Sequence, residues 1–102
     1  MMYNQTMETE FQGRPIEWDD EKNAKNIRKH GLSFETAAYV FADPNRIEIY
    51  DEMHSDGEDR WQVIGCIGKI VFVIYTERGD ATRLISARLA TARERMVYYG
   101  NS

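Results

Sequence analysis

Apolar positions along this chain follow two spacings, one typical of strands and one typical of helices. In the second half, four segments have strand-like patterns: residues 47–50, 61–66, 70–75 and 83–87. Glycines separate these segments, and the short Gly68-Lys69 connection favours a hairpin, so we expect consecutive antiparallel strands. The stretch 70–74 is apolar at every position, which is typical of a central strand covered on both faces.

The first half contains shorter periodic segments. Residues 16–18 alternate and predict an edge strand. Asp19 or Asp20 can cap a helix that ends at His30-Gly31. Ala24 and Ile27 give this helix only a narrow apolar stripe, so we expect it to lie on the surface of the core. Capping by Ser33 predicts a second helix over 34–41, and a last helix spans 91–99. The order predicts an α+β domain: a small antiparallel meander with two N-terminal helices and one C-terminal helix.

Length and composition favour a single domain. The chain has 102 residues, of which 42% are hydrophobic, enough for one modest core. Residues 1–14 are polar and aperiodic, so we expect a flexible N-terminal extension followed by one domain over 15–102. No apolar run is long enough for a membrane span or shaped like a secretory signal, and we expect a cytoplasmic protein. The single cysteine, Cys66, excludes an internal disulfide and is interpreted as a small buried filler.

The charge is unevenly distributed, although the whole chain carries a net charge of −4. Residues 1–59 hold 14 acidic and 6 basic side chains, whereas residues 60–102 hold 3 acidic and 7 basic ones. Such asymmetry favours one face for a polyanion and another for a basic partner.

The sequence predicts neither a metal site nor a cofactor. His30 and His54 lie on different predicted elements, outside any known metal-binding spacing. The acidic residues around His54 lack the spacing of a calcium loop and are interpreted as a solvated acidic turn. Neither Ser33 nor Ser86 has the setting of a nucleophilic serine.

Arginines are the remaining candidates for chemistry, because they recur through the meander and the last helix. Alternation predicts that one strand face carries Leu84, Ser86 and Arg88, and the other Arg83, Ile85 and Ala87. An arginine within a strand needs a negative partner, either a carboxylate such as Glu58, Glu77 or Glu94, or a phosphate. Arg93 and Arg95 are expected to face solvent. Metal-free RNA cleavage requires a base for the ribose 2′-hydroxyl, an acid for the leaving oxygen and fixed cations, and this chain has suitable residue types.

Several ordered motifs resemble one family of bacterial toxins. The opening motif is Trp18-Asp19-x-x-Lys22-x-x-x-Asn26-x-x-Lys29-His30-Gly31-x-Ser33-Phe34-Glu35-x-Ala37. The later motifs are Asp51-Glu52, Gly57-Glu58-x-Arg60, Tyr75-Thr76-x-Arg78, Arg83-x-Ile85-Ser86-Ala87-Arg88-x-Ala90 and Glu94-Arg95-x-x-Tyr98. Together these segments, from about residue 16 to residue 99, resemble the BrnT toxins.

The resemblance implies a RelE-like fold, a metal-independent ribonuclease and an antitoxin of the BrnA type. It further implies that the toxin–antitoxin complex binds promoter DNA through the antitoxin. A second hypothesis is a non-catalytic module that binds the antitoxin and acts as a co-repressor. A direct DNA binder is not favoured, since no basic recognition helix is apparent.

Site roles also follow from the resemblance. Arg60, Arg78 and Arg88 are expected to bind the scissile phosphate. Either Glu58 or His54 is the expected base. The candidates for donating a proton or orienting the RNA are Lys29, His30 and Tyr98. For His30 the alternative is a contact with the last carbonyls of its helix. Trp18 and Trp61 are expected in the core.

Overall fold

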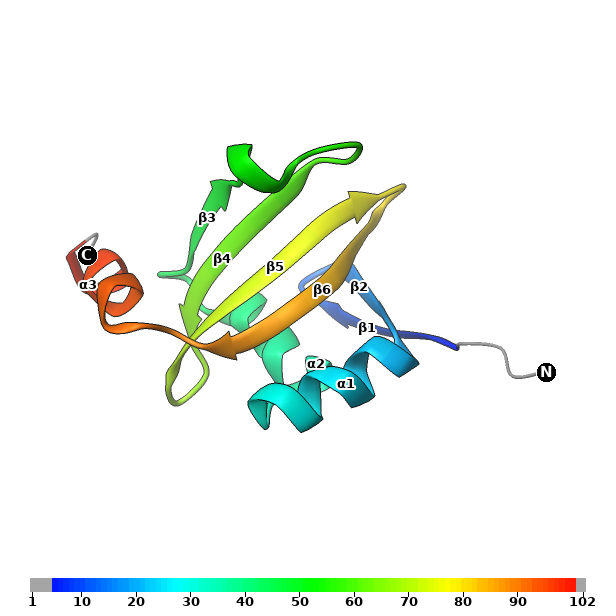
Figure 1. The fold of residues 1–102 in the computed structure, drawn as a ribbon, viewed down its shortest axis with the longest axis horizontal. Coiled ribbons are helices and arrows are strands. Elements are labelled where there is room, and N and C mark those ends of the chain that lie inside the picture. Colours follow the sequence, from blue (N-terminus) through cyan, green and yellow to red (C-terminus); the bar gives the residue numbers. More distant parts are fainter. Residues whose placement is uncertain (1–4, 101–102) are drawn as a thin grey trace.

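The computed structural model describes residues 5–100, which form a six-stranded mixed sheet with the strand order β1-β2-β6-β5-β4-β3 (Figure 1). The strands are β1 (Thr6–Phe11), β2 (Arg14–Asp19), β3 (Ile47–Tyr50), β4 (Arg60–Cys66), β5 (Ile70–Arg78) and β6 (Ala81–Leu89). Neighbouring strands are antiparallel except β2 and β6, which pair in parallel. The four strands β3 to β6 form the meander that the sequence predicts, but the expectation of a purely antiparallel sheet is wrong because of the β2–β6 pair.

β5 lies within the sheet, between β4 and β6, and its side chains enter two apolar clusters. Val71, Val73 and Tyr75 belong to a larger cluster that includes residues from the segment 32–41. Ile70 and Phe72 belong to a smaller cluster on the other face. The prediction of a strand covered on both faces is therefore confirmed for residues 70–73, which are buried, whereas Ile74 is only half-buried on the face of the smaller cluster.

Helices cover the two faces unequally. α1 (Asp20–His30), α2 (Phe34–Ala37) and the 3₁₀ helix η1 (Ala38–Ala42) follow β2, and η2 (Glu52–His54) is a 3₁₀ turn between β3 and β4. The segment expected to be one helix over 34–41 thus changes from α to 3₁₀ after Ala37. α3 (Ala92–Gly100) stands apart from α1 and α2 (Figure 1) and contacts β4. Because α3 covers only part of its face, the rest of the sheet there stays accessible.

α1 is held to the sheet by polar contacts. Asn26 is the buried residue of this helix, and its amide bonds the backbone N–H and C=O of Ala87 and the C=O of Leu32. Ala24 is exposed and Ile27 is 44% exposed. The expected position of α1 on the surface of the core is confirmed, but its apolar stripe does not make the contact: the Asn26 amide bonds backbone groups of β6 and of the loop after α1 instead.

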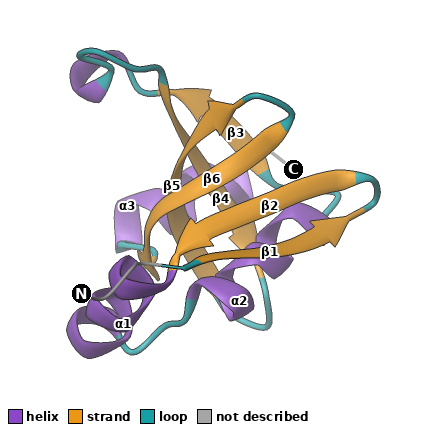
Figure 2. Cartoon of the chain, turned by 90° about the vertical axis from the view of Figure 1, so that its right-hand side faces the viewer, coloured by secondary structure: helices purple, strands orange, loops and turns teal. Residues whose placement is uncertain are grey.

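The N-terminal segment pairs with the sheet where a flexible extension was expected. Strand β1 pairs with β2 through the two-residue turn Gln12-Gly13, in which both φ angles are positive, and the hairpin lies beside β6 (Figure 2). The expected edge position of residues 16–18 is wrong, because β1 and β6 flank β2. Arg14 donates hydrogen bonds to Thr82 and Glu48, which ties this segment to later strands. Residues 1–4 of the expected extension lie outside the described residues.

The predictions for individual core residues, Trp18, Trp61 and Cys66, are only partly confirmed. Trp18 is 4% exposed and lies in the larger cluster, as expected, whereas Trp61 is half-buried at its border. Cys66 is exposed, so its interpretation as a buried filler is wrong: it is the last residue of β4, where burial ends. Within residues 5–100, the helices are too short and too polar to cross a lipid bilayer.

Candidate active site

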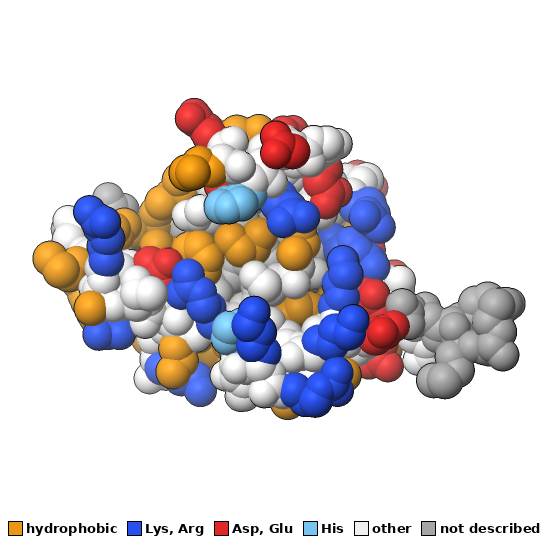
Figure 3. All heavy atoms as spheres, in the orientation of Figure 1, with side chains coloured by type: hydrophobic (Ala, Val, Ile, Leu, Met, Phe, Trp, Pro, Cys, Tyr) orange, Lys and Arg blue, Asp and Glu red, His pale blue; other side chains and the backbone are white. Residues whose placement is uncertain are grey.

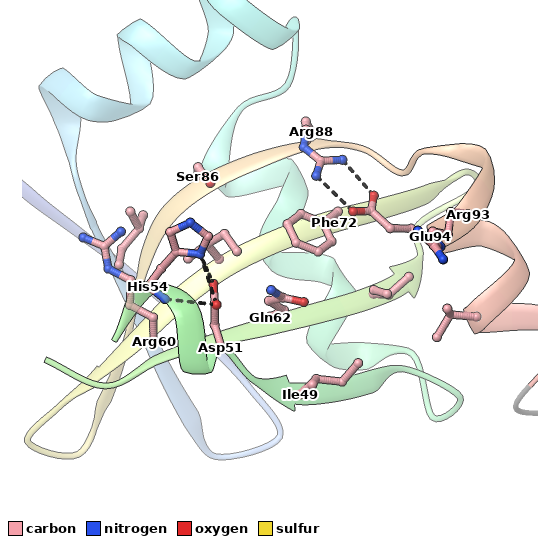
Figure 4. A pocket seen from close by; sticks show the side chains of 14 residues that line it. Ile49, Asp51, His54, Arg60, Gln62, Phe72, Ser86, Arg88, Arg93 and Glu94 are labelled. Atoms are coloured by element: carbon pink, nitrogen blue, oxygen red, sulfur yellow. Dashed lines mark hydrogen bonds and ion pairs between the residues drawn. The ribbon is translucent and has the colours of Figure 1, made fainter. Parts of the chain in front are cut away.

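A cavity of about 550 Å³ opens on the sheet face that α3 leaves accessible. Its floor is apolar and includes Ile64, Phe72 and Ile74 from β4 and β5. His54 and Arg60 lie at one end, and Arg88 and its neighbours on α3 lie at the other (Figure 4). The space-filling view shows apolar atoms in this hollow with cationic side chains around it (Figure 3). An apolar floor with a cationic rim suits a ligand that combines a flat ring with a negative charge.

At one end, the imidazole of His54 is oriented by a buried carboxylate. Asp51 is 5% exposed and accepts the backbone N–H of His54, and its two oxygens lie 3.0 and 3.1 Å from His54 Nδ1. Burial opposes ionisation of Asp51, but hydrogen bonds from His54 and Gln62 outweigh it and lower its pKa. Because an ionised carboxylate only accepts hydrogen bonds, Nδ1 carries the proton, which leaves Nε2 as an acceptor in the neutral ring.

Arg60 supplies a cation at the same end of the cavity (Figure 4). It begins β4, and its backbone is fixed by Ser55, whose hydroxyl accepts the Arg60 N–H. The guanidinium forms no ion pair with any described residue, and its Nε is buried without a hydrogen-bond partner. A buried donor without a partner favours an anion, because an unmet hydrogen bond of a charged group costs free energy.

At the other end, Arg88 is paired within the protein. Its Nη1 and Nη2 donate to the two oxygens of Glu94 at 2.7 and 3.0 Å, and its guanidinium lies 4.2 Å from the centre of the Phe72 ring. Burial opposes ionisation of Glu94, but the bonds from Arg88 and from the Thr91 backbone outweigh it and lower the pKa of Glu94. The sequence prediction of a carboxylate partner for the strand arginines is confirmed for Arg88. Arg83 pairs instead with Glu17, a partner that we did not predict.

A β-bulge decides which residues of β6 face this cavity. Ile74 pairs with Ser86 but the next residue, Tyr75, pairs with Leu84, so Ile85 is an extra residue in β6. The predicted alternation is wrong for that reason. Leu84 and Ala87 both enter the larger core cluster, and the cavity is lined by Ile85, Ser86 and Arg88.

The remaining sequence candidates lie in three places. Lys29 and His30, at the end of α1, line a shallow groove that shares Ile85 and Ser86 with the cavity. Glu58 and Arg78 are exposed and do not line it. Tyr98 lines a separate pocket, where its hydroxyl donates to Asp43 at 2.7 Å. The structure thus gathers His54, Arg60 and Arg88 in one cavity, places Lys29 and His30 beside it, and leaves three candidates outside.

Several lining residues were not predicted as site residues. These are Asp51, Gln62, Ser86, Arg93 and Glu94. Asp51 belongs to the stretch interpreted as a solvated acidic turn, an interpretation that its burial contradicts. The signal was its position three residues before His54, where a carboxylate can cap the 3₁₀ turn and reach the ring. Within residues 5–100, no cluster of three or more histidine, cysteine or acidic side chains is placed to bind a metal.

Comparisons with known proteins agree on one family. Residues 18–94 match the sequence profile of the family described as the ribonuclease toxin BrnT of type II toxin–antitoxin systems. The fold is similar to the crystal structure of the Brucella abortus ribonuclease toxin BrnT, with a TM-score of 0.54 and 29% identity. That similarity covers 72% of this chain and 92% of the Brucella chain. Among proteins with curated descriptions, none matches this sequence significantly.

Proposed function

This chain belongs to the BrnT family of ribonuclease toxins of type II toxin–antitoxin systems, and we propose that it cleaves RNA internally by a metal-independent mechanism. The observation that carries the proposal is the pairing of His54 with the buried Asp51, beside the unpaired guanidinium of Arg60. These groups provide a base and a fixed cation at one end of a cavity that is wide enough for a nucleotide.

In the proposed reaction, Nε2 of His54 accepts the proton of a ribose 2′-hydroxyl. The freed oxygen attacks the adjacent phosphorus, and Arg60 stabilises the charge on the phosphoryl oxygens. The bond from phosphorus to the 5′-oxygen breaks, and Lys29 or His30 in the adjoining groove donates a proton to that oxygen. The products are a 2′,3′-cyclic phosphate and a 5′-hydroxyl.

Arg88 is assigned to a second phosphate. In the register of the sheet, Arg60 lies opposite Thr76 of β5, and Arg88 lies opposite Phe72 of the same strand. Phe72 and Thr76 are four positions apart in β5, which corresponds to about 13 Å of extended chain. Because the two arginines also lie at opposite ends of the cavity (Figure 4), we assign Arg60 to the scissile phosphate and Arg88 to a neighbouring one.

The test is cleavage of single-stranded RNA in the presence of a metal chelator. We expect fragments that end in cyclic phosphate, and a loss of rate of about a hundredfold or more in His54→Ala. Met53→Ala is the matched control, because Met53 is 84% exposed on the same 3₁₀ turn and does not line the cavity. Unchanged cleavage by His54→Ala would remove His54 from the reaction.

A second candidate function is a non-catalytic module that binds the antitoxin and acts as a co-repressor. It is favoured by the Arg88–Glu94 ion pair, which already neutralises one cation of the cavity. If the wild-type protein binds the antitoxin but leaves RNA intact with and without chelator, this function replaces the first.

The partner is proposed to be a BrnA-type antitoxin in the cytoplasm, through which the complex binds promoter DNA. The excess of acidic residues in the first half of the chain supports a basic antitoxin segment. We also propose that the fold is related to that of the RelE toxins. Co-expression with the adjacent gene and recovery of a stable complex on promoter DNA test the partner directly.

A further inference from the structure

Three lysines lie along one side of α1, next to the sheet. Lys22, Lys25 and Lys29 line a groove of about 240 Å³ together with Asn26 and residues of β6. Asn26 fixes this side of the helix against β6 through its bonds to Ala87. Lys22 lies four residues before Asn26 and Lys29 three residues after it, so helical geometry places both along the same seam.

The positive charges of Lys22, Lys25 and Lys29, the lysine row of α1, are largely not neutralised by ion pairs within the described residues. Lys22 and Lys29 are exposed and form no ion pair with any residue in the range 5–100. Lys25 lies 3.7 Å from Glu21, but both side chains are more than half exposed, and such a pair contributes little free energy. In a chain with a net charge of −4, this is a local concentration of positive charge.

The groove adjoins the cavity. Ile85 and Ser86 line both, because the bulge in β6 turns these two consecutive residues toward the accessible side of the sheet. A strand of RNA that leaves the cavity near Ser86 therefore crosses β6 and reaches α1. Lys22 and Lys29 are seven residues apart, about 10 Å along the helix axis, which provides room for more than one phosphate.

We propose that the lysine row of α1 is a second subsite, which binds the phosphate backbone of single-stranded RNA beyond the nucleotide held in the cavity. This inference rests on the proposed ribonuclease function and names the path of its substrate. Lysine contacts to phosphates are independent of base sequence, so the row contributes affinity for longer RNA without reading its sequence.

The experiment measures binding and cleavage separately. The binding probe is a single-stranded RNA of about 20 nucleotides with 2′-O-methyl groups, which block attack by the 2′-oxygen. In Lys22→Gln/Lys25→Gln, we expect binding about tenfold weaker than in the wild type at low salt. The slope of log Kd against log salt concentration falls by about 1.4, since each phosphate contact on a single strand contributes about 0.7. Cleavage of unmodified long RNA falls more than cleavage of a dinucleotide.

The matched control is Arg28→Gln/Lys69→Gln, which removes the same charge from exposed positions outside the groove. We expect its affinity and salt slope to stay within about twofold of the wild type. An equal loss in both double variants would overturn the subsite, because net charge alone would then explain it. Undiminished RNA binding together with weaker antitoxin binding would also overturn it and assign the row to the protein partner.

Failure of the subsite differs from failure of the proposed function. A wild-type protein that binds the methylated probe but cleaves neither substrate contradicts the ribonuclease mechanism, whatever the lysine variants do. A protein that cleaves long and short substrates with the same efficiency ratio in wild type and lysine variant contradicts the subsite alone.

Discussion

Arg88 and Glu94 form a two-point ion pair across the mouth of the cavity, with hydrogen bonds of 2.7 and 3.0 Å. The carboxylate occupies the two guanidinium donors that a phosphate would take, so under the proposed function Glu94 and an RNA phosphate compete for Arg88. Glu94 also closes a capping box with Thr91, through bonds in both directions between side chain and backbone.

The first prediction concerns this competition. Glu94→Gln removes the negative charge but keeps an oxygen for the Thr91 N–H, so α3 stays capped. We expect the methylated RNA probe to bind about three- to tenfold more tightly, because the phosphate no longer displaces a charged partner. Glu35→Gln, at an exposed position of α2, is the control for net charge. Weaker or unchanged binding in Glu94→Gln would show that Arg88 does not contact RNA phosphate.

The second prediction concerns the orientation of His54. Asp51→Asn keeps the size of the side chain but removes the charge that fixes the proton on Nδ1. We expect kcat to fall about a hundredfold with little change in KM, since the base is misoriented while the RNA contacts persist. Glu52→Gln, exposed on the same 3₁₀ turn, leaves both constants unchanged. If KM rises and kcat is retained, Asp51 acts on binding instead.

The third prediction concerns the attachment of α1. Asn26→Ala leaves the N–H and C=O of Ala87 and the C=O of Leu32 without their side-chain partner. We expect the free energy of unfolding in urea to fall by about 2–4 kcal/mol, because these groups are buried. Ile27→Ala, on the exposed side of the same helix, costs less than about 1 kcal/mol. The opposite order would restore the apolar stripe as the anchor of α1.

The elements that sequence could predict are those with a strong local pattern. Strands β3 to β6 have apolar alternation or continuous apolar runs, and glycine turns separate them. β1 is harder to recognise because it is an exposed edge strand with few apolar residues, in the sequence TMETEF. Its clearest sequence signal was Gly13, because glycine readily adopts the positive φ that the two-residue hairpin turn at Gln12-Gly13 requires.

The site was less predictable than the fold, since it depends on contacts between distant segments. Arg60 and His54 were among the candidates, but nothing local distinguishes them from Arg78 or Glu58. The bulge at Ile85 moves Leu84 to the core face, and no pattern in the sequence marks that position. The role of Asn26 could not be predicted either, because its amide bonds the backbone of Ala87, which lies 61 residues later in the sequence.

The fourth prediction concerns the pH dependence of stability through Tyr98 and Asp43. The hydrogen bond to Asp43, with burial, raises the pKa of Tyr98 to about 12. Burial opposes ionisation of Asp43, but bonds from Tyr98 and backbone N–H groups lower its pKa. The raised pKa of Tyr98 contributes stability that is fully present below the unfolded-state pKa of about 10. This contribution is lost as pH rises toward 12. The lowered pKa of Asp43 contributes stability that is present above pH of about 4, the unfolded-state pKa. This contribution is lost as pH falls below that value.

Urea unfolding of the wild type and Tyr98→Phe across this range checks the prediction. We expect the wild type to be more stable at neutral pH, with the difference shrinking above pH of about 10 and below pH of about 4. Tyr39→Phe is the control, because Tyr39 is 56% exposed and the substitution keeps its ring contact with Phe11. A difference that is constant across the range would mean that the hydroxyl does not bond an ionised carboxylate.

The parallel contact between β2 and β6 joins residues that are 66 positions apart, as in the pair Glu17 and Arg83. During translation, β2 is synthesised early, but it cannot pair with β6 until most of the chain has been made. Pairings across such separations form late, since a long loop must close first. The cavity beside α3 is lined by residues between Ile49 and Val97, so its walls are complete only when nearly the whole chain has been synthesised.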